Sequence, residues 1–417
     1  MLIEFSVKNF MSFKDKVTLS MEKGSGNENI DNVVFNDITN LLKVSAIYGA
    51  NASGKSNLLK AFTCAILMVR DSSKIPLEGK WNFIKPFLFD SKTRNMPSEF
   101  EFIFIANNIK YRYFFSADEN KIYDELLEAY YTQKPTTIFS RTNTNTYEFA
   151  SDKNKLEILK SNNTENKLFL TTATTWNYDK TKDAYLWFIN QIDTYDSLET
   201  IRDKDLIEYK NKDEELKKFA LKLLKKADIL IKDIYVDYEE KEIDNTSMTS
   251  ITKMTGDSKL KNIKIEFEHV VVDENNNSHV YKLPYALESS GTKVLFAFAP
   301  FLKRAFNSTK VVIIDELEKS MHPMLVEFII KLFNNKEINK SNSQLIFATH
   351  ATNLLNLEIL RRDQIWFTEK DELTGISTLY PLDSFSVRKD ENIEKGYTNG
   401  RYGAIPFIKD VDLWQEE

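Results

Sequence analysis

The sequence predicts an α/β fold in which a parallel sheet carries a glycine-rich loop and an antiparallel lobe accompanies it. Residues 44–56 read VSAIYGANASGKS, a short apolar strand that runs into the loop. Residues 81–150 alternate apolar and polar positions, as in EFEFIFIANNIKYRYFF, which is typical of antiparallel hairpins. From residue 285 onward, helical segments and short apolar strands alternate, and this order of elements is typical of α/β domains.

The remaining segments fit the same scheme. Residues 2–21 predict two short strands around the string NFMSF, and an apolar run after the loop predicts a helix over 56–70. The string DEELKKFALKLLKKAD predicts an amphipathic helix, and KIEFEHVVV followed by HVYKL predicts a further hairpin. We therefore expect four parts, which are an N-terminal lobe (1–150), a compact, mainly helical insertion (151–228), a C-terminal lobe (229–380) and a tail (381–417).

Composition limits the class of protein. The 417 residues are 42% hydrophobic and 28% charged, which is typical of a soluble globular chain of one large or two domains. The formal net charge of −6 argues against a chain that is basic throughout and binds nucleic acid. Cys64 is the only cysteine, so no disulfide forms within the chain, and a reducing cytoplasm is expected. The longest apolar runs are about nine residues, whereas a membrane span needs roughly 20.

The string GANASGKS at 49–56 has the form G-x-x-x-x-G-K-[ST], placed after a strand and before a helix. In this arrangement backbone N–H groups surround phosphates, Lys55 reaches the β- and γ-phosphates, and the Ser56 hydroxyl binds Mg²⁺. No guanine-reading string is evident, so adenine is favoured. The residues expected to bind the nucleotide here are Gly49, Asn51, Ser53, Gly54, Lys55, Ser56 and Asn57.

Two later strands end in side chains that suit the same site. VVIIDE at 311–316 is a buried parallel strand that ends in Asp315, placed to hold Mg²⁺, and Glu316, placed to polarise the attacking water. QLIFATH at 344–350 is a buried strand that ends in His350, which we expect to contact the γ-phosphate. The other histidines show no metal-ligand spacing.

The string ESSGT, which contains Ser289, Ser290 and Gly291, allows two interpretations. Serines before an apolar helix are good N-caps. Small hydroxyl residues at a helix N-terminus also suit contact with a phosphate. Both interpretations are compatible with one structure.

The strings NFMSF, GANASGKSNLL, ESSGT, VVIIDE, MHP and ATH together resemble the ABC-type ATPase heads of the SMC class. The likeness is closer to the compact ATPases of bacterial abortive-infection and restriction-linked operons, of the AbiL and AriA type. The C-terminal strings LRRDQIWFTEKD and VRKDENIEKGYTNGRYGAIP resemble that group in particular. The resemblance implies an ABC-type P-loop ATPase head that uses ATP and Mg²⁺.

The resemblance also implies roles for individual residues. Asp315 would be the Mg²⁺-side acid, Glu316 the general base and His350 the switch histidine. ELEKSMHP would be the segment that crosses to the partner subunit. Ser289, Ser290 and Gly291 would form a signature that reaches the γ-phosphate of the other protomer, although the string departs from the transporter form LSGGQ.

A site completed by a second copy implies a homodimer or a multiple of dimers. We expect a regulatory ATPase of an anti-phage system that responds to a phage trigger and holds or activates a separately encoded toxin or nuclease. The alternative is a DNA-binding repair or recombination ATPase like SMC heads, for which KKFALKLLKK would supply a basic face. The cluster KGYTNGRYGAIP at 395–406 is either an effector or inter-dimer contact or a loop that closes over the sheet edge.

Overall fold

The computed structural model describes residues 1–196, 206, 208–209, 213–242, 259–319, 321–388 and 391–406. The chain forms two compact units. The first unit comprises Met1–Asp196, Ser308–Glu318 and Ile329–Glu417, and the second comprises Ser197–Asn307 and Lys319–Phe328. These boundaries differ from the expected ones, because the segment 151–228 is divided between the two units.

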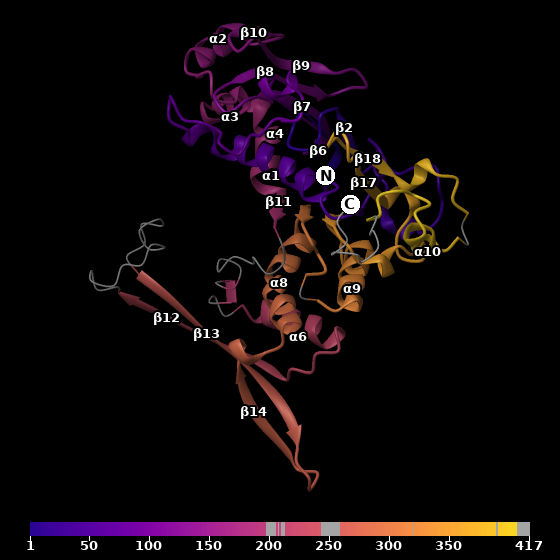
Figure 1. Ribbon diagram of the computed structural model, residues 1–417. Helices are drawn as coiled ribbons and strands as arrows, with labels where there is room; N and C mark the ends of the chain where they lie inside the picture. The colour runs from indigo at the N-terminus through magenta and orange to yellow at the C-terminus, as the bar shows by residue number, and fades with distance from the viewer. Residues whose placement is uncertain are drawn as a thin grey trace, which may run out of the picture. The chain divides into compact units, whose positions relative to one another are not determined.

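An antiparallel sheet forms one layer of the first unit (Figure 1). Its inward positions carry aromatic and aliphatic side chains at every second residue, which is the periodicity predicted from the sequence. In spatial order its strands are β10 (Thr146–Phe149), β9 (Thr136–Thr142), β8 (Ile122–Tyr130), β7 (Ile109–Ala117), β6 (Ser98–Ala106), β1 (Leu2–Lys8) and β2 (Val17–Ser20).

A second sheet of the first unit carries the glycine-rich loop. Its first five strands are parallel, and the last is antiparallel to its neighbour. Every residue of β5, β15 and β16 is buried, as expected for parallel strands covered on both faces. The spatial order is β11 (Ile192–Tyr195), β15 (Val311–Ile314), β16 (Gln344–Ala348), β5 (Val44–Tyr48), β17 (Ile365–Lys370) and β18 (Ser377–Pro381).

Helix α1 (Lys55–Asp71) contacts strands of both sheets, namely β1 on one side and β11 and β16 on the other. Its Phe62 ring stacks on Phe5 with ring centroids 3.7 Å apart. The side chain of Gln344 also joins the sheets, because it accepts from the Leu2 N–H at 2.7 Å and donates to the Leu2 carbonyl at 3.0 Å. The helix that begins at the glycine-rich loop is therefore fixed by the main hydrophobic core.

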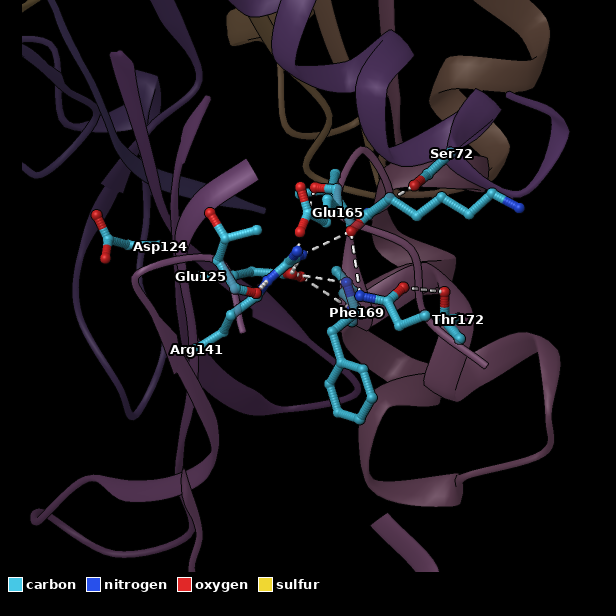
Figure 2. A network of polar contacts seen from close by, with 12 residues as sticks. Ser72, Asp124, Glu125, Arg141, Glu165, Phe169 and Thr172 are labelled. Carbon is cyan, nitrogen blue, oxygen red and sulfur yellow. Dashed lines mark hydrogen bonds and ion pairs between the residues drawn. The ribbon is translucent and has the colours of Figure 1, made fainter. Parts of the chain in front are cut away.

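Helices α2 (Lys153–Ser161), α3 (Phe169–Thr175) and α4 (Asp179–Asn190) belong to the first unit. Figure 2 shows the buried polar network that ties α3 to the antiparallel sheet. The Glu125 carboxylate of β8 accepts the N–H groups of Phe169 and Leu170. Arg141 of β9 lies 3.9 Å from Glu125 and donates to the carbonyls of Thr144, Glu165 and Lys167.

The second unit combines helices with a separate three-stranded antiparallel sheet. The strands are β12 (Asp233–Glu242), β13 (Lys259–Val272) and β14 (Ser278–Pro284), and the predicted hairpin of the last two is confirmed. The helices are α6 (Glu214–Lys226) and α8 (Ser290–Asn307), and α9 (Pro323–Asn334) begins in this unit. Inside the unit, Phe296 of α8 stacks on Tyr209 at 4.4 Å.

The mixed α/β class with a glycine-rich loop and an antiparallel lobe is confirmed. Two parts of the expectation differ from the structure: the segment 151–228 contains a strand of the parallel sheet, and the strands of 229–284 form their own sheet instead of joining the C-terminal lobe. The described residues also include β3 (Val33–Val34), β4 (Leu41–Leu42), α10 (Ile393–Thr398) and several short 3-10 helices. Among the helices in the described residues, none is both long and apolar enough to cross a bilayer.

Candidate nucleotide-binding site

The loop between β5 and α1 needs glycine at both ends because other strands lie directly against it. A Cβ atom at Gly49 would lie 2.5 Å from the Thr368 carbonyl oxygen, and one at Gly54 would lie 2.7 Å from the Ser377 Oγ. Gly54 also has a φ of +125°, which side chains with a Cβ rarely adopt. The spacing of the two glycines therefore follows from close packing against β17 and β18.

The hydroxyl groups of β17 and β18 hold the loop in place. Ser53 Oγ lies 2.6 Å from Thr368 Oγ1, and the Ser377 hydroxyl donates to the Ser53 carbonyl at 2.6 Å. On α1, the Asn57 amide donates to Ser12 Oγ at 2.8 Å, which connects the loop to the NFMSF string. The loop is thus pre-shaped before any ligand binds.

The register of the parallel sheet brings the predicted site residues together. Ile314 pairs with Phe347, and Ala348 pairs with Ile47, so β5, β15 and β16 end at the same edge. A cavity of about 320 Å³ lies at that edge. It is lined by Asn51, Ala52, Ser53, Gly54, Lys55, Ser56, Asn57, Asp315, Glu316, His350 and Lys370.

Ser56 and Asp315 both line this cavity, and the Ser56 hydroxyl is close enough to favour the charged form of the Asp315 carboxylate. Burial raises the pKa of Asp315. A bound cation would lower that pKa again, because it favours the charged carboxylate. One hydroxyl and one carboxylate oxygen are the kind of ligands that Mg²⁺ takes when phosphates and water supply the rest, so this pair fits the metal.

The Lys55 ammonium lies over the loop and donates to the carbonyls of Gly49 at 2.8 Å and Ala50 at 3.1 Å. Burial lowers the pKa of Lys55 to about 8, against the charges of Asp315, Glu318 and Glu316, which raise it. The hydrogen-bond partners of this ammonium are neutral carbonyls, which bind it less strongly than anionic oxygens do. An anionic phosphate in the cavity would compensate its charge.

Glu316 is exposed at the mouth of the cavity and has a φ of 48°. A residue with a Cβ adopts this left-handed conformation at a cost of about 1–3 kcal/mol, and such outliers gather at functional sites. Because of this conformation, the chain turns at Glu316 and does not continue in the direction of β15. Its position suits a carboxylate that polarises a water molecule next to the phosphates.

His350 lines the same cavity, and its backbone N–H donates to Glu318 Oε1 at 2.6 Å. Burial lowers the pKa of His350, with a further contribution from Lys55. Glu318 Oε2 is buried and accepts no hydrogen bond from the described residues. Sequence reasoning did not single out Glu318, although it lies within the ELEKSMHP string that follows Asp315.

The ESSGT string forms the start of α8 in the second unit. Ser289 Oγ accepts from the Thr292 N–H at 3.1 Å and lies 2.7 Å from Thr292 Oγ1, so the capping interpretation is correct. Ser289 and Ser290 are exposed, and a Cβ atom at Gly291 would meet nothing closer than 3.6 Å. Contact between this string and a nucleotide remains a prediction.

The cluster at 395–406 packs onto the edge strands of the parallel sheet. Tyr402 is buried and stacks on Phe367 at 5.9 Å, while its hydroxyl donates to Glu391 at 2.7 Å. Arg401 forms an ion pair with the same Glu391. The Tyr380 hydroxyl donates to the Tyr402 carbonyl at 2.9 Å. These contacts correspond to the second interpretation, a loop that closes over the sheet edge.

The partners Thr368, Ser377 and Lys370 were not assigned to the site from the sequence, because they follow the glycine-rich loop by more than 300 residues. Thr368 and Lys370 lie in the string LRRDQIWFTEKD, which indicated the resemblance but no contact with the loop. By contrast, every predicted residue of the loop after Gly49, together with Asp315, Glu316 and His350, lines one cavity.

Two solved structures are similar in overall fold. An SMC head domain from Thermotoga maritima is 15% identical in sequence and covers 91% of this chain and 98% of its own, with a TM-score of 0.41. An SMC head bound to the C-winged helix domain of ScpA is 14% identical and covers 91% of this chain and 97% of its own, with a TM-score of 0.39. At these values neither likeness carries an argument about function.

No curated protein matches the chain significantly in sequence. The profile of one family matches residues 44–356, a span that contains the glycine-rich loop, Asp315, Glu316 and His350. The chain therefore belongs to the family described as "AAA domain, putative AbiEii toxin, Type IV TA system".

Proposed function

We propose that the chain binds ATP with Mg²⁺ and hydrolyses it to ADP and phosphate. The observation that carries the proposal is the single cavity that joins the glycine-rich loop to Asp315, Glu316 and His350. Family membership supports it, because the match spans these residues.

Each group of the cavity has a role in this reaction. Lys55 exchanges its two carbonyl partners for the β- and γ-phosphates. When bound at Ser56 and Asp315, Mg²⁺ supplies positive charge that the phosphate oxygens need. Glu316 orients and deprotonates the attacking water, and His350, whose pKa burial lowers, donates to the γ-phosphate.

The test replaces Glu316 by Gln. Removal of a general base lowers the rate by about 100-fold or more, so Glu316→Gln should hydrolyse ATP at least that much more slowly. It should still bind Mg²⁺-ATP, because Lys55 and the loop are unchanged. Turnover and ATP binding would be measured side by side, with the exposed Glu337→Gln as the control. Wild-type turnover in Glu316→Gln would show that Glu316 is not the base.

The hydrolytic site is completed by a second copy of the chain in this proposal. Ser289 and Ser290 are exposed at the N-terminus of an 18-residue helix, where backbone N–H groups attract anions. ATP bound by one protomer would be contacted by these residues of the other protomer. Binding of nucleotide would thereby be converted into association of two chains.

The cellular role in this proposal is anti-phage defence through a separately encoded toxin or nuclease. The family description names a toxin–antitoxin system, which supports a toxic partner and a regulatory role for the ATPase. Cells that carry the gene with its neighbours should resist phage, and Glu316→Gln should remove that resistance. Equal plaque counts with and without the wild-type locus would contradict this role.

A further inference from the structure

A larger cavity, of about 1520 Å³, adjoins the glycine-rich loop within the first unit. The two cavities share Asn51, Ala52, Ser53 and Lys370, so the second begins where the phosphate site ends. One wall of the larger cavity is the glycine-rich loop. The other three are the segment around Phe87–Asp90, the β17–β18 loop and the residues around Ile405. The roles proposed above for the site residues leave this volume unused.

Phe89 is the aromatic surface of this cavity, and 74% of its side chain is exposed. A Cβ atom at Gly375 would lie 2.6 Å from Phe89 Cδ2, so the β17–β18 loop packs closely against one edge of the ring through a glycine that has φ +69°. Phe87 meets the ring edge-on at 5.7 Å, and the Lys370 ammonium lies 5.8 Å from its centroid. An exposed ring supported in this way is a preformed stacking platform.

Asn9 of the NFMSF string holds the segment that carries Phe89. Its side-chain carbonyl accepts from the Phe87 N–H at 3.0 Å, and its amide donates to the carbonyls of Thr93 and Met96. On the same wall, Lys14 and Asp90 form an ion pair at 2.7 Å, which lowers the pKa of the Asp90 carboxyl. The stacking platform is therefore held by the side chains of Asn9 and Lys14, which lie between the N-terminal strands β1 and β2.

The outer wall is the end of the 395–406 cluster. Ala404, Ile405 and Pro406 line the cavity, and the Ala404 N–H donates to Glu369 Oε1 at 3.3 Å. Both this wall and the β17–β18 loop lie after residue 356, where the family match ends. The cavity is thus built largely from residues that the family match does not include.

We propose that this cavity takes the base and ribose of the nucleotide, with Phe89 as the surface on which the base stacks and Ile405 as part of the outer wall. The inference rests on the proposed ATP binding, because the shared residues Asn51–Ser53 connect the base site to the phosphates. It also gives the glycine- and tyrosine-rich cluster a function, which is to hold Ala404, Ile405 and Pro406 against the bound nucleoside.

The test compares binding of Mg²⁺-ATP with binding of Mg²⁺-tripolyphosphate, which lacks the base and ribose, by calorimetry on the full chain. Base–aromatic stacking is worth enough that Phe89→Ala should weaken ATP binding about tenfold. Binding of tripolyphosphate should stay the same in Phe89→Ala. The conservative variant Phe89→Trp should keep ATP affinity, and ATP should quench its added indole fluorescence whereas tripolyphosphate should not.

The matched control is Phe35→Ala, since Phe35 is also exposed, at 59%, and lines neither cavity. Ile405→Ala should weaken ATP binding in the same selective way as Phe89→Ala, by a smaller factor. If ATP affinity is unchanged in Phe89→Ala, or if ATP and tripolyphosphate lose affinity equally, the proposed base site is wrong. The proposed ATP binding would still hold in that case, because the wild-type chain would bind ATP. A wild-type chain that bound neither ligand would overturn the proposed function as well.

Discussion

Two carboxylates of one short turn differ in environment. Glu316 is exposed in a left-handed conformation at the mouth of the cavity, whereas Glu318 holds the backbone N–H of His350 at 2.6 Å. A charge-assisted hydrogen bond of this length fixes the turn after β16. The Tyr48 hydroxyl is also buried without a hydrogen-bond partner among the described residues. Burial raises the pKa of that phenol, and the charge of Glu318 raises it further. Glu318 is absent from the lining of the cavity, so we expect it to act on the site by positioning the backbone of His350.

Substitution of Glu318 tests this positioning role. Glu318→Ala should lower kcat about tenfold or more, because a hydrogen bond to a charged group is lost, and should leave the dissociation constant for ATP within about twofold. Glu318→Gln retains an acceptor and should keep most of the activity. Steady-state kinetics together with direct ATP binding would measure both. Equal losses of kcat in the Ala and Gln variants would show that the hydrogen bond from the His350 N–H to residue 318 does not support catalysis.

At the scale of elements, the sequence predicted those strands and helices whose periodicity is strong. β5, β15 and β16 are short runs of buried residues, and most positions of the β6–β7 hairpin alternate between apolar and polar, so both were evident. β11 was missed because IDTY is a four-residue strand with two polar positions inside a charged segment. The separate sheet of β12–β14 was missed because pairing partners are tertiary information that periodicity does not contain.

The join between β8 and α3 depends on the buried pair of Glu125 and Arg141 (Figure 2). Glu125→Ala would leave the Arg141 charge without its partner, and loss of one member of a buried pair costs about 3–5 kcal/mol. The free energy of unfolding, measured with urea, should fall by that amount. The control is Glu99→Ala, which removes a surface pair with Lys8 worth about 0–1 kcal/mol. Similar small losses in both variants would mean that the buried network does not stabilise the fold.

At the scale of the whole molecule, each unit carries one half of the proposed composite site. The first unit holds the glycine-rich loop and the general-base candidate, and the second holds the capped start of α8 with Ser289 and Ser290 exposed. Both halves are predicted from short strings of the sequence, and the contact of Ser289 and Ser290 with a nucleotide stays a prediction. The sequence could not show the base-and-ribose cavity, because that cavity is assembled from segments near residues 10, 90, 370 and 405.

The central claim is that two chains associate with ATP bound between them. The most direct test is the mass of the Glu316→Gln variant in solution, with and without ATP. The chain has a mass of 48.6 kDa. Light scattering after size exclusion should show that the mass of the particle in solution doubles when Mg²⁺-ATP is added, whether the nucleotide-free particle is one chain or an oligomer. The double variant that also carries Ser289→Arg should bind ATP without this doubling, because a long cationic side chain would block the partner's nucleotide. An unchanged mass of Glu316→Gln with ATP bound, or doubling that persists in the double variant, would contradict the composite site.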